Sequence, residues 1–222
     1  MGLEEERAKR REGLLSEEFA ALLPEAIGPY RLQRTDAQND RIYEAYAYED
    51  AATGWRVRIL FDEETMDYMV KTDFRLFVLA DIDLITGDFE EFQKRIPQFF
   101  EKNFRRLLLD RPVSVAVNAH AFTNWDFSPF LPPEVVAFRR MIAPDAPIQG
   151  LNGSYIIAMY ENREKACGIL FYYNYFREFY YAEGCAHGVP IILHDYDAAD
   201  LKTLEEILRA RLESDLEKLA DE

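Results

Sequence analysis

The chain has few cysteines and no long apolar run, and both absences narrow its class. Cys167 and Cys185 are the only cysteines among 222 residues, too few for a disulfide framework. A reducing compartment is therefore the simpler expectation. No apolar run approaches the roughly 20 residues that span a bilayer, and residues 1–15 lack the hydrophobic segment of a secretory signal. We expect a cytoplasmic protein that does not span a membrane.

Positive charge is also in deficit. The chain has 26 Lys and Arg against 41 Asp and Glu, a formal net charge of −15. Residues 1–86 carry −8, residues 87–150 are neutral, and residues 151–222 carry −7. Such a field repels nucleic-acid phosphates and anionic lipid, so neither is an expected partner. It favours encounter with a basic protein, although acidity often serves solubility alone.

Sequence motifs for catalysis are missing as well. There is no G-x-x-x-x-G-K-S/T phosphate loop and no G-x-S-x-G nucleophile elbow, and neither cysteine stands in a nucleophile motif. His120 alternates with small and apolar residues in VNAHAF, a pattern typical of a histidine in the core. The sequence therefore predicts no cofactor and leans away from an enzyme.

What is present is material for a core. Apolar residues make up 49% of the chain and aromatic residues 14%. Aromatic and β-branched runs bounded by turn-forming segments predict strands, and apolar stripes at helical spacing predict helices. The expected helices cover residues 3–23, 88–109 with a break at Pro97, 132–142, and 197 to the carboxyl terminus. The expected strands cover residues 30–35, 41–48, 55–61, 68–85, 113–122, 154–160, 168–182 and 190–194.

This order predicts an α+β fold of antiparallel meander sheets covered by amphipathic helices. Residues 1–222 would form one domain or two fused structural repeats, about 1–110 and 111–222. The case for repeats is that Gly54 and Gly153 each precede a short strand, a polar turn, a long aromatic strand and an Asp-capped helix, with Asp88 and Asp197 as the caps.

The densest group of reactive side chains lies near residue 188. If Gly188-Val189 is a two-residue hairpin turn, then Glu183, Cys185, His187 and His194 share one face of a sheet. Thiolate, imidazole and carboxylate all bind zinc, but the spacing matches no zinc-ligand signature. We therefore expect a packed cysteine with hydrogen-bonded histidines and predict no metal.

A second pair of carboxylates, Asp81 and Asp83, is two residues apart and would lie on one face of a strand. Such a pair can hold Mg²⁺, yet no phosphate-cradling loop accompanies it. The simpler interpretation places both acids on a solvent-facing surface.

The segment Phe171–Tyr181, FYYNYFREFYY, has an unusual density of aromatics on both faces of a predicted strand. Aromatic strands stack bases or sugars in some proteins, but the basic residues that would follow phosphates are missing here. A central strand covered on both sides explains the composition more simply.

The loop at residues 123–133 carries large apolar residues beside prolines, and a loop normally runs over the surface. These side chains either tuck back into the core or form a protein-binding patch. The patch would comprise Trp125, Phe127, Phe130 and Leu131.

The function that these features favour is non-enzymatic. We expect an adaptor, escort or inhibitor that binds a protein partner or itself. The alternative is a small-ligand-binding protein or metal-dependent enzyme with an aromatic-lined pocket, using Asp81 and Asp83 or the Glu183, Cys185 and His194 group.

Overall fold

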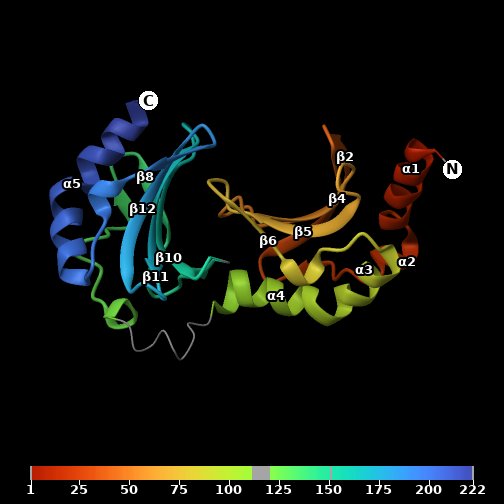
Figure 1. The fold of residues 1–222 in the computed structure, drawn as a ribbon, viewed down its shortest axis with the longest axis horizontal. Helices are drawn as coiled ribbons and strands as arrows, with labels where there is room; N and C mark the ends of the chain where they lie inside the picture. The colour runs from red at the N-terminus through yellow and green to blue at the C-terminus, as the bar shows by residue number, and fades with distance from the viewer. Residues whose placement is uncertain (1, 112–120, 151, 222) are drawn as a thin grey trace. The chain divides into compact units, whose positions relative to one another are not determined.

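The fold is known from a computed structural model, which describes residues 2–111, 121–150 and 152–221. The chain divides into two compact units, Met1–Asp110 and Arg111–Glu222. Each unit pairs an antiparallel meander sheet with helices, so the α+β class predicted from the sequence is confirmed (Figure 1). No helix of the described residues combines the length and apolarity needed to cross a lipid bilayer.

The first unit begins with helices α1 (Leu3–Leu14) and α2 (Glu17–Ala20), separated at Ser16, which caps α2 by accepting a hydrogen bond from the Phe19 N–H. A six-stranded sheet follows in sequential order: β1 (Ala26–Ile27), β2 (Tyr30–Asn39), β3 (Ile42–Glu49), β4 (Arg56–Asp62), β5 (Asp67–Asp73) and β6 (Val78–Ala80). A 3₁₀ turn, η1 (Ile82–Leu84), then leads to the covering helices.

A helical run covers one face of the first sheet. It passes through α3 (Phe89–Arg95), a π-helical segment (Ile96–Phe100), α4 (Glu101–Arg105) and a second π-helical segment (Arg106–Asp110). Pro97 lies in the first π-helical segment, as expected of a residue that lacks the N–H of a regular helix. Aromatic rings join helix and sheet: Tyr48 packs on Phe100 and Phe104, at ring-centre distances of 5.4 and 5.6 Å.

The second unit contains a seven-stranded sheet. Its main path runs β13 (Val189–Ile192), β12 (Phe179–Ala186), β11 (Cys167–Asn174), β10 (Ser154–Asn162), β8 (Phe138–Ile142) and β7 (Glu134–Val135), and β9 (Ile148–Gln149) also pairs with β10. The 3₁₀ turn η5 (His194–Tyr196) leads to helix α5 (Leu201–Asp221).

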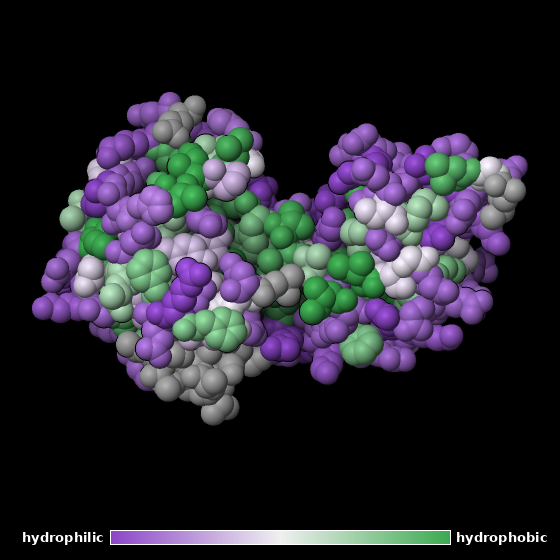
Figure 2. Space-filling model, viewed as in Figure 1, coloured by the Kyte–Doolittle hydropathy of each residue, from purple (hydrophilic) through white to green (hydrophobic). Residues whose placement is uncertain are grey.

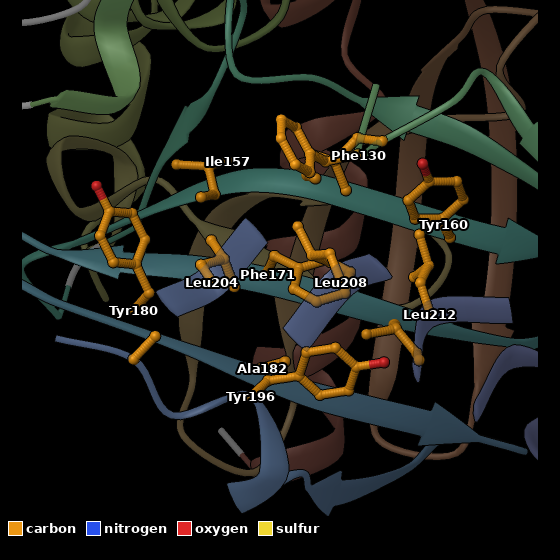
Figure 3. Packing of buried hydrophobic residues seen from close by; sticks show 14 of the residues in the cluster. Phe130, Ile157, Tyr160, Phe171, Tyr180, Ala182, Tyr196, Leu204, Leu208 and Leu212 are labelled. Carbon is orange, nitrogen blue, oxygen red and sulfur yellow. The ribbon is translucent and has the colours of Figure 1, made fainter. Parts of the chain in front are cut away.

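Helix α5 lies along one face of the second sheet (Figure 1). The leucines of the helix predicted at the carboxyl terminus form one stripe along α5. Leu204, Leu208, Leu212, Leu216 and Leu219 are buried, and Leu201 is partly buried against the same core. Figure 3 shows Leu204, Leu208 and Leu212 meeting aromatic and aliphatic side chains of the strands. Burying such side chains contributes roughly 1.5–3 kcal/mol each before the entropy of ordering is subtracted.

Equivalent elements of the two units share local hydrogen bonds. Tyr48 and Tyr160, 112 residues apart, each donate the hydroxyl to a proline carbonyl, of Pro24 and Pro132, at 2.6 Å. Other equivalent features have the same spacing: the bridges Tyr68–Thr86 and Tyr180–Ala198, the side-chain-capped turns at Asp62 and Asn174, and the helix caps Asp88 and Asp200. The elements of the two units therefore match one to one from β3 and β10 onward.

Several predicted elements are wrong in detail. Residues 132–142 form the hairpin of β7 and β8 instead of a helix, turning at Val136, whose φ is 54°. The strand predicted at 168–182 is two strands with a turn at 175–178, and the one at 68–85 ends at Asp73. The last helix is capped by Asp200, which accepts from the Thr203 N–H, and not by Asp197. Most of the strand predicted at 113–122, with His120, lies outside the described residues.

Most of the surface in view on each unit is hydrophilic (Figure 2). Counted by unit, residues 1–110 carry a formal charge of −8 and residues 111–222 carry −7. The acidity is thus divided almost equally between the two units.

Candidate protein-binding surface

The side chains near residue 188 that could bind a metal do not come together. The turn comprises His187 and Gly188, both at positive φ, so Cys185 pairs with Pro190 and Glu183 pairs with Ile192. His194 lies beyond the strand in η5, where its Nδ1 is 3.1 Å from a carboxylate oxygen of Asp197. Glu183 and Cys185 are alternate residues of β12 and share one face of the strand. The prediction that His187 and His194 join them there is wrong, because His187 belongs to the turn and His194 to η5. In the described ranges, no three His, Cys, Asp or Glu side chains are placed to hold a metal ion together.

Asp81 and Asp83 are not strand residues, because β6 ends at Ala80 and both belong to the η1 turn. Asp81 caps this turn by accepting from the Asp83 N–H at 3.1 Å. The Asn103 amide donates to both carboxylates, at 3.0–3.1 Å. Burial raises the pKa of Asp81, although the Asn103 hydrogen bonds act in the opposite direction. The pair is accounted for as a helix-anchoring turn.

A pocket of about 260 Å³ lies in the first unit, where α1 meets the start of α3. Arg10 occupies one side, donating to the Gly87 carbonyl at 2.6 Å and lying 5.7 Å from the Tyr68 ring centre. Burial raises the pKa of Tyr68 to about 12, although Arg10 lowers it. The pocket lining contains no cysteine, histidine or serine. The lining does include acidic side chains and a lysine, which are groups that can bind a ligand or take part in catalysis.

The loop at 123–133 packs on α5. The Trp125 indole N–H donates to Glu205 at 2.8 Å, and the Trp125 ring stacks on Phe130 at 5.9 Å. Phe130 and Leu131 are buried, whereas Trp125 and Phe127 are partly buried against the same core. The sequence left two alternatives for this loop, packing into the core or display for a partner, and these four side chains pack against the core. Partner binding by them stays a prediction.

Two arginines hold the same loop. The Arg209 guanidinium lies 4.6 Å from the centre of the Phe130 ring, and the Arg140 guanidinium lies 4.9 Å from that of Phe127. Cation–π contacts of this kind contribute roughly 0.5–2 kcal/mol each, depending on exposure. The aromatic rings of the loop therefore make their contacts with other residues of the second unit.

The aromatic segment Phe171–Tyr181 displays a side chain that the sequence reasoning missed. Asn174 ends β11, and its side-chain oxygen accepts from the N–H groups of Phe176 and Arg177 at 3.1 and 3.0 Å. This fixes the turn at residues 175–178, and Glu178 completes it at a φ of 51°. The result is a rigid aromatic turn, the name used below for residues 175–178.

Phe176 is the anchor of the aromatic turn. Its side chain is 77% exposed, the highest value among the exposed large hydrophobic residues of the described chain. The ring lies against Gly153, where a Cβ atom would come within 2.4 Å of two ring carbons, and it contacts the Tyr175 ring at 4.4 Å. Gly153 also has a φ of 77°. Glycine is therefore favoured here both by the closeness of the ring and by the backbone conformation. The exposed ring therefore lies against Gly153 and the Tyr175 ring.

The equivalent turn of the first unit is built in the same way but used differently. Asp62 accepts from the N–H groups of Glu64 and Thr65, and Met66 has the positive φ. Its acidic side chains bind neighbours of the same unit: Glu63 pairs with Arg11 at 2.7 Å, and Glu64 pairs with Arg41. One backbone design therefore serves internal ion pairs in one unit and an exposed aromatic ring in the other.

A row of polar and aromatic side chains continues from the aromatic turn across the face of the second sheet that is turned away from α5. The Tyr181 hydroxyl lies 3.2 Å from Ser154 Oγ, next to Gly153. The Tyr181 ring stacks on Tyr172 at 4.7 Å with an interplanar angle of 6°. Burial raises the pKa of Tyr172, and its hydrogen bond to Glu183 raises it further. Ser154 is itself buried. The surface formed by Phe176, Tyr181, Tyr172, Glu183 and Ile192 is called the tyrosine face below.

The tyrosine face ends at Ile192, directly opposite Glu183 and 69% exposed. The two most exposed large hydrophobic residues of the described chain thus lie at its two ends, with a stacked tyrosine pair between them. Tyrosine side chains present broad rigid contact area with a polar tip, and aromatic anchors carry much of the energy in protein interfaces. The arrangement suits contact with another protein.

The sequence contained a signal for the aromatic turn. Asn174 lies 112 residues after Asp62, and both residue types favour turns. Read without the comparison of the two units, the segment predicts one uninterrupted strand. No family model, curated protein or solved structure matches the chain.

Proposed function

We propose that this chain is a non-enzymatic protein-binding protein, an adaptor, escort or inhibitor, that uses the tyrosine face with Phe176 as its anchor. The observation that carries the proposal is the 77% exposure of a phenylalanine on a rigid, side-chain-capped turn. Exposing such a ring forfeits roughly 1.5–3 kcal/mol of burial that a partner's pocket would supply.

Charge supports a basic protein as the partner. The second unit carries −7, and Glu183 places a carboxylate in the middle of the tyrosine face. A basic surface approaching this unit would be steered by the field and would meet a carboxylate beside two aromatic rings. Placement in the cytoplasm belongs to the same proposal.

The test begins with identification of the partner. A photo-crosslinking amino acid at Arg177, next to the anchor, is introduced into the chain in the cells that produce it, and the crosslinked protein is purified. Calorimetric titration with that partner then compares the wild type with Phe176→Ala. We expect about a tenfold or greater loss of affinity, in line with removal of an aromatic anchor.

Two controls accompany that titration. Ile82→Ala removes an exposed side chain of similar size in the first unit, 63% exposed, and should leave the affinity unchanged. Trp125→Ala tests the loop predicted from the sequence. Wild-type affinity in Phe176→Ala would contradict the proposal, and a loss confined to Trp125→Ala would move the binding surface to the loop. Sedimentation over a range of concentrations shows whether a second copy is the partner.

The alternative function is a small-ligand-binding protein or enzyme, and the observation in its favour is the pocket of about 260 Å³ beside Tyr68. Metal analysis of the untagged protein and a thermal-shift screen with divalent ions and nucleotides test it. A saturable stabilisation that Tyr68→Phe abolishes would favour this alternative over protein binding.

A further inference from the structure

A group of basic side chains lies on the face of the first sheet that is turned away from α3 and α4. Arg58 on β4 is directly opposite Lys71 on β5, so two like charges are cross-strand neighbours. Side chains in this relation are about 4.5–5.5 Å apart at Cβ, and like charges there destabilise a sheet. The arrangement is unexpected in a unit whose net charge is −8.

One acid compensates part of this charge. Glu44 is buried and accepts from Arg58 Nε at 2.5 Å and from Arg56 Nη2 at 2.8 Å. Both of its carboxylate oxygens are thereby engaged by arginines, which leaves Lys71 uncompensated. Lys71 makes no hydrogen bond or ion pair with any residue that the structure describes. The Arg58 Nη groups make none either within the same ranges.

Small side chains flank these two cations. Ala47 flanks Arg58 across the strand pair, and Ala80 flanks Lys71 on the other side. The row across four strands is therefore alanine, arginine, lysine and alanine. Arg58 is 24% exposed, which lets an external group reach a guanidinium whose orientation Glu44 fixes.

In the second unit, the equivalent sheet positions carry no basic side chains. Leu170 is equivalent to Arg58, Glu183 to Lys71, and Ile156 to Glu44. The same kind of sheet therefore forms without the basic group, which is not a requirement of the fold. Keeping two adjacent cations costs stability, and a bound anion would offset that cost.

We propose that Arg58 and Lys71 form an oxyanion-binding site, which takes a carboxylate or a phosphate between the Arg58 Nη groups and the Lys71 ammonium. Arg58, held by Glu44, supplies planar hydrogen-bond donors, and Lys71 supplies a point charge, the usual division between these residues. The site belongs to the first unit and does not depend on the protein-binding proposal for the tyrosine face.

The full-length protein is titrated at constant ionic strength with inorganic phosphate, with a tetraglutamate peptide, and with chloride as the reference salt. NMR follows the Lys71 and Arg58 backbone and side-chain signals. We expect saturable shifts with phosphate or the peptide and none with chloride. The phosphate and peptide arms separate the two sources of the oxyanion.

Lys71→Gln removes the uncompensated charge without breaking an ion pair, so this variant should fold normally. Its affinity for the oxyanion should fall about tenfold, as expected for one lost charge-assisted hydrogen bond. Lys71→Arg should keep binding, and Lys102→Gln, at an exposed lysine elsewhere in this unit, should match the wild type. Saturable binding by neither anion, or unchanged affinity in Lys71→Gln, would overturn the proposal.

Discussion

At the scale of single residues, Tyr48 and Tyr160 perform the same task in the two units. Each buried hydroxyl donates to a proline carbonyl at 2.6 Å. The bond connects the tyrosine's strand, β3 or β10, to the segment of chain that precedes the sheet of the same unit. Burial raises the pKa of both tyrosines, so the hydroxyls are protonated donors throughout the working range.

The prediction is that Tyr48→Phe and Tyr160→Phe each lower the free energy of unfolding by about 1–2 kcal/mol, because a buried carbonyl loses its donor while packing is kept. Urea unfolding measures the change. Tyr175→Phe, at a partly buried tyrosine of the aromatic turn, is the control and should differ little from the wild type. An unchanged midpoint in both buried variants would show that these bonds contribute nothing to stability.

Single residues also explain why some predictions failed. The sequence Pro132-Pro133-Glu134 is typical of a helix start, but Val136 adopts a φ of 54° and turns the chain into a hairpin. In the first unit Gly28 occupies the equivalent turn with a φ of 59°, and a glycine is a recognisable sequence signal for a positive φ. A valine at such a position gives no signal, since β-branched residues rarely adopt it.

At the scale of elements, alternation and helical spacing predicted the most. In β4, Val57, Ile59 and Phe61 are buried on one side, and Arg56 and Arg58 lie on the other side together with Leu60, which is also buried. The residue pairing between neighbouring strands was harder to predict. The β12–β13 hairpin shifts from the prediction because His187, not Val189, takes the second positive φ beside Gly188. That single choice separates Cys185 from His194 and dissolves the predicted cluster.

The candidate site depended on tertiary contacts that no local pattern contains. Whether Trp125 or Phe176 is displayed is decided by what lies beneath each ring, α5 for Trp125 and Gly153 for Phe176. Both are aromatic residues in loops of similar polarity, so composition alone ranks them alike.

The edge strand β13 carries a prediction of its own. In the His187-Gly188 hairpin, Val189 and Ile191 hydrogen-bond toward β12, so the backbone of Pro190 and Ile192 points outward. Proline at an outward position removes a donor from an apolar edge that would otherwise template pairing between molecules. We expect Pro190→Thr to increase self-association, measured by sedimentation velocity against protein concentration.

Val189→Thr is the matched control for this edge, because it introduces the same side chain on the same strand while its N–H already faces β12. It should sediment as the wild type does. Equal self-association in both variants would point to side-chain polarity, and none in Pro190→Thr would contradict the role of the missing N–H.

At the scale of the whole molecule, the two units repeat one design with different surfaces. Shared features are structural: the tyrosine–proline bonds, the side-chain-capped turns, and the aspartate caps of the covering helices. Features that differ are the aromatic turn of the second unit and the basic group of the first. A pair of equivalent units thus acts as an internal comparison, in which the positions that diverge are the ones we propose for binding.

We propose that the units are two fused structural repeats, and the last prediction follows from their cores. The second unit has a hydrophobic cluster of its own, in which α5 closes one face of the sheet, and the first has its aromatic layer between α3, α4 and the strands. Separate chains of residues 1–110 and 111–222 should therefore each give native-like circular dichroism and a cooperative urea transition. If instead only the intact chain unfolds cooperatively and both fragments lack near-ultraviolet signals, the protein is one domain. The near-ultraviolet measurement separates these outcomes because each unit contains one tryptophan, Trp55 or Trp125, packed among other aromatic rings.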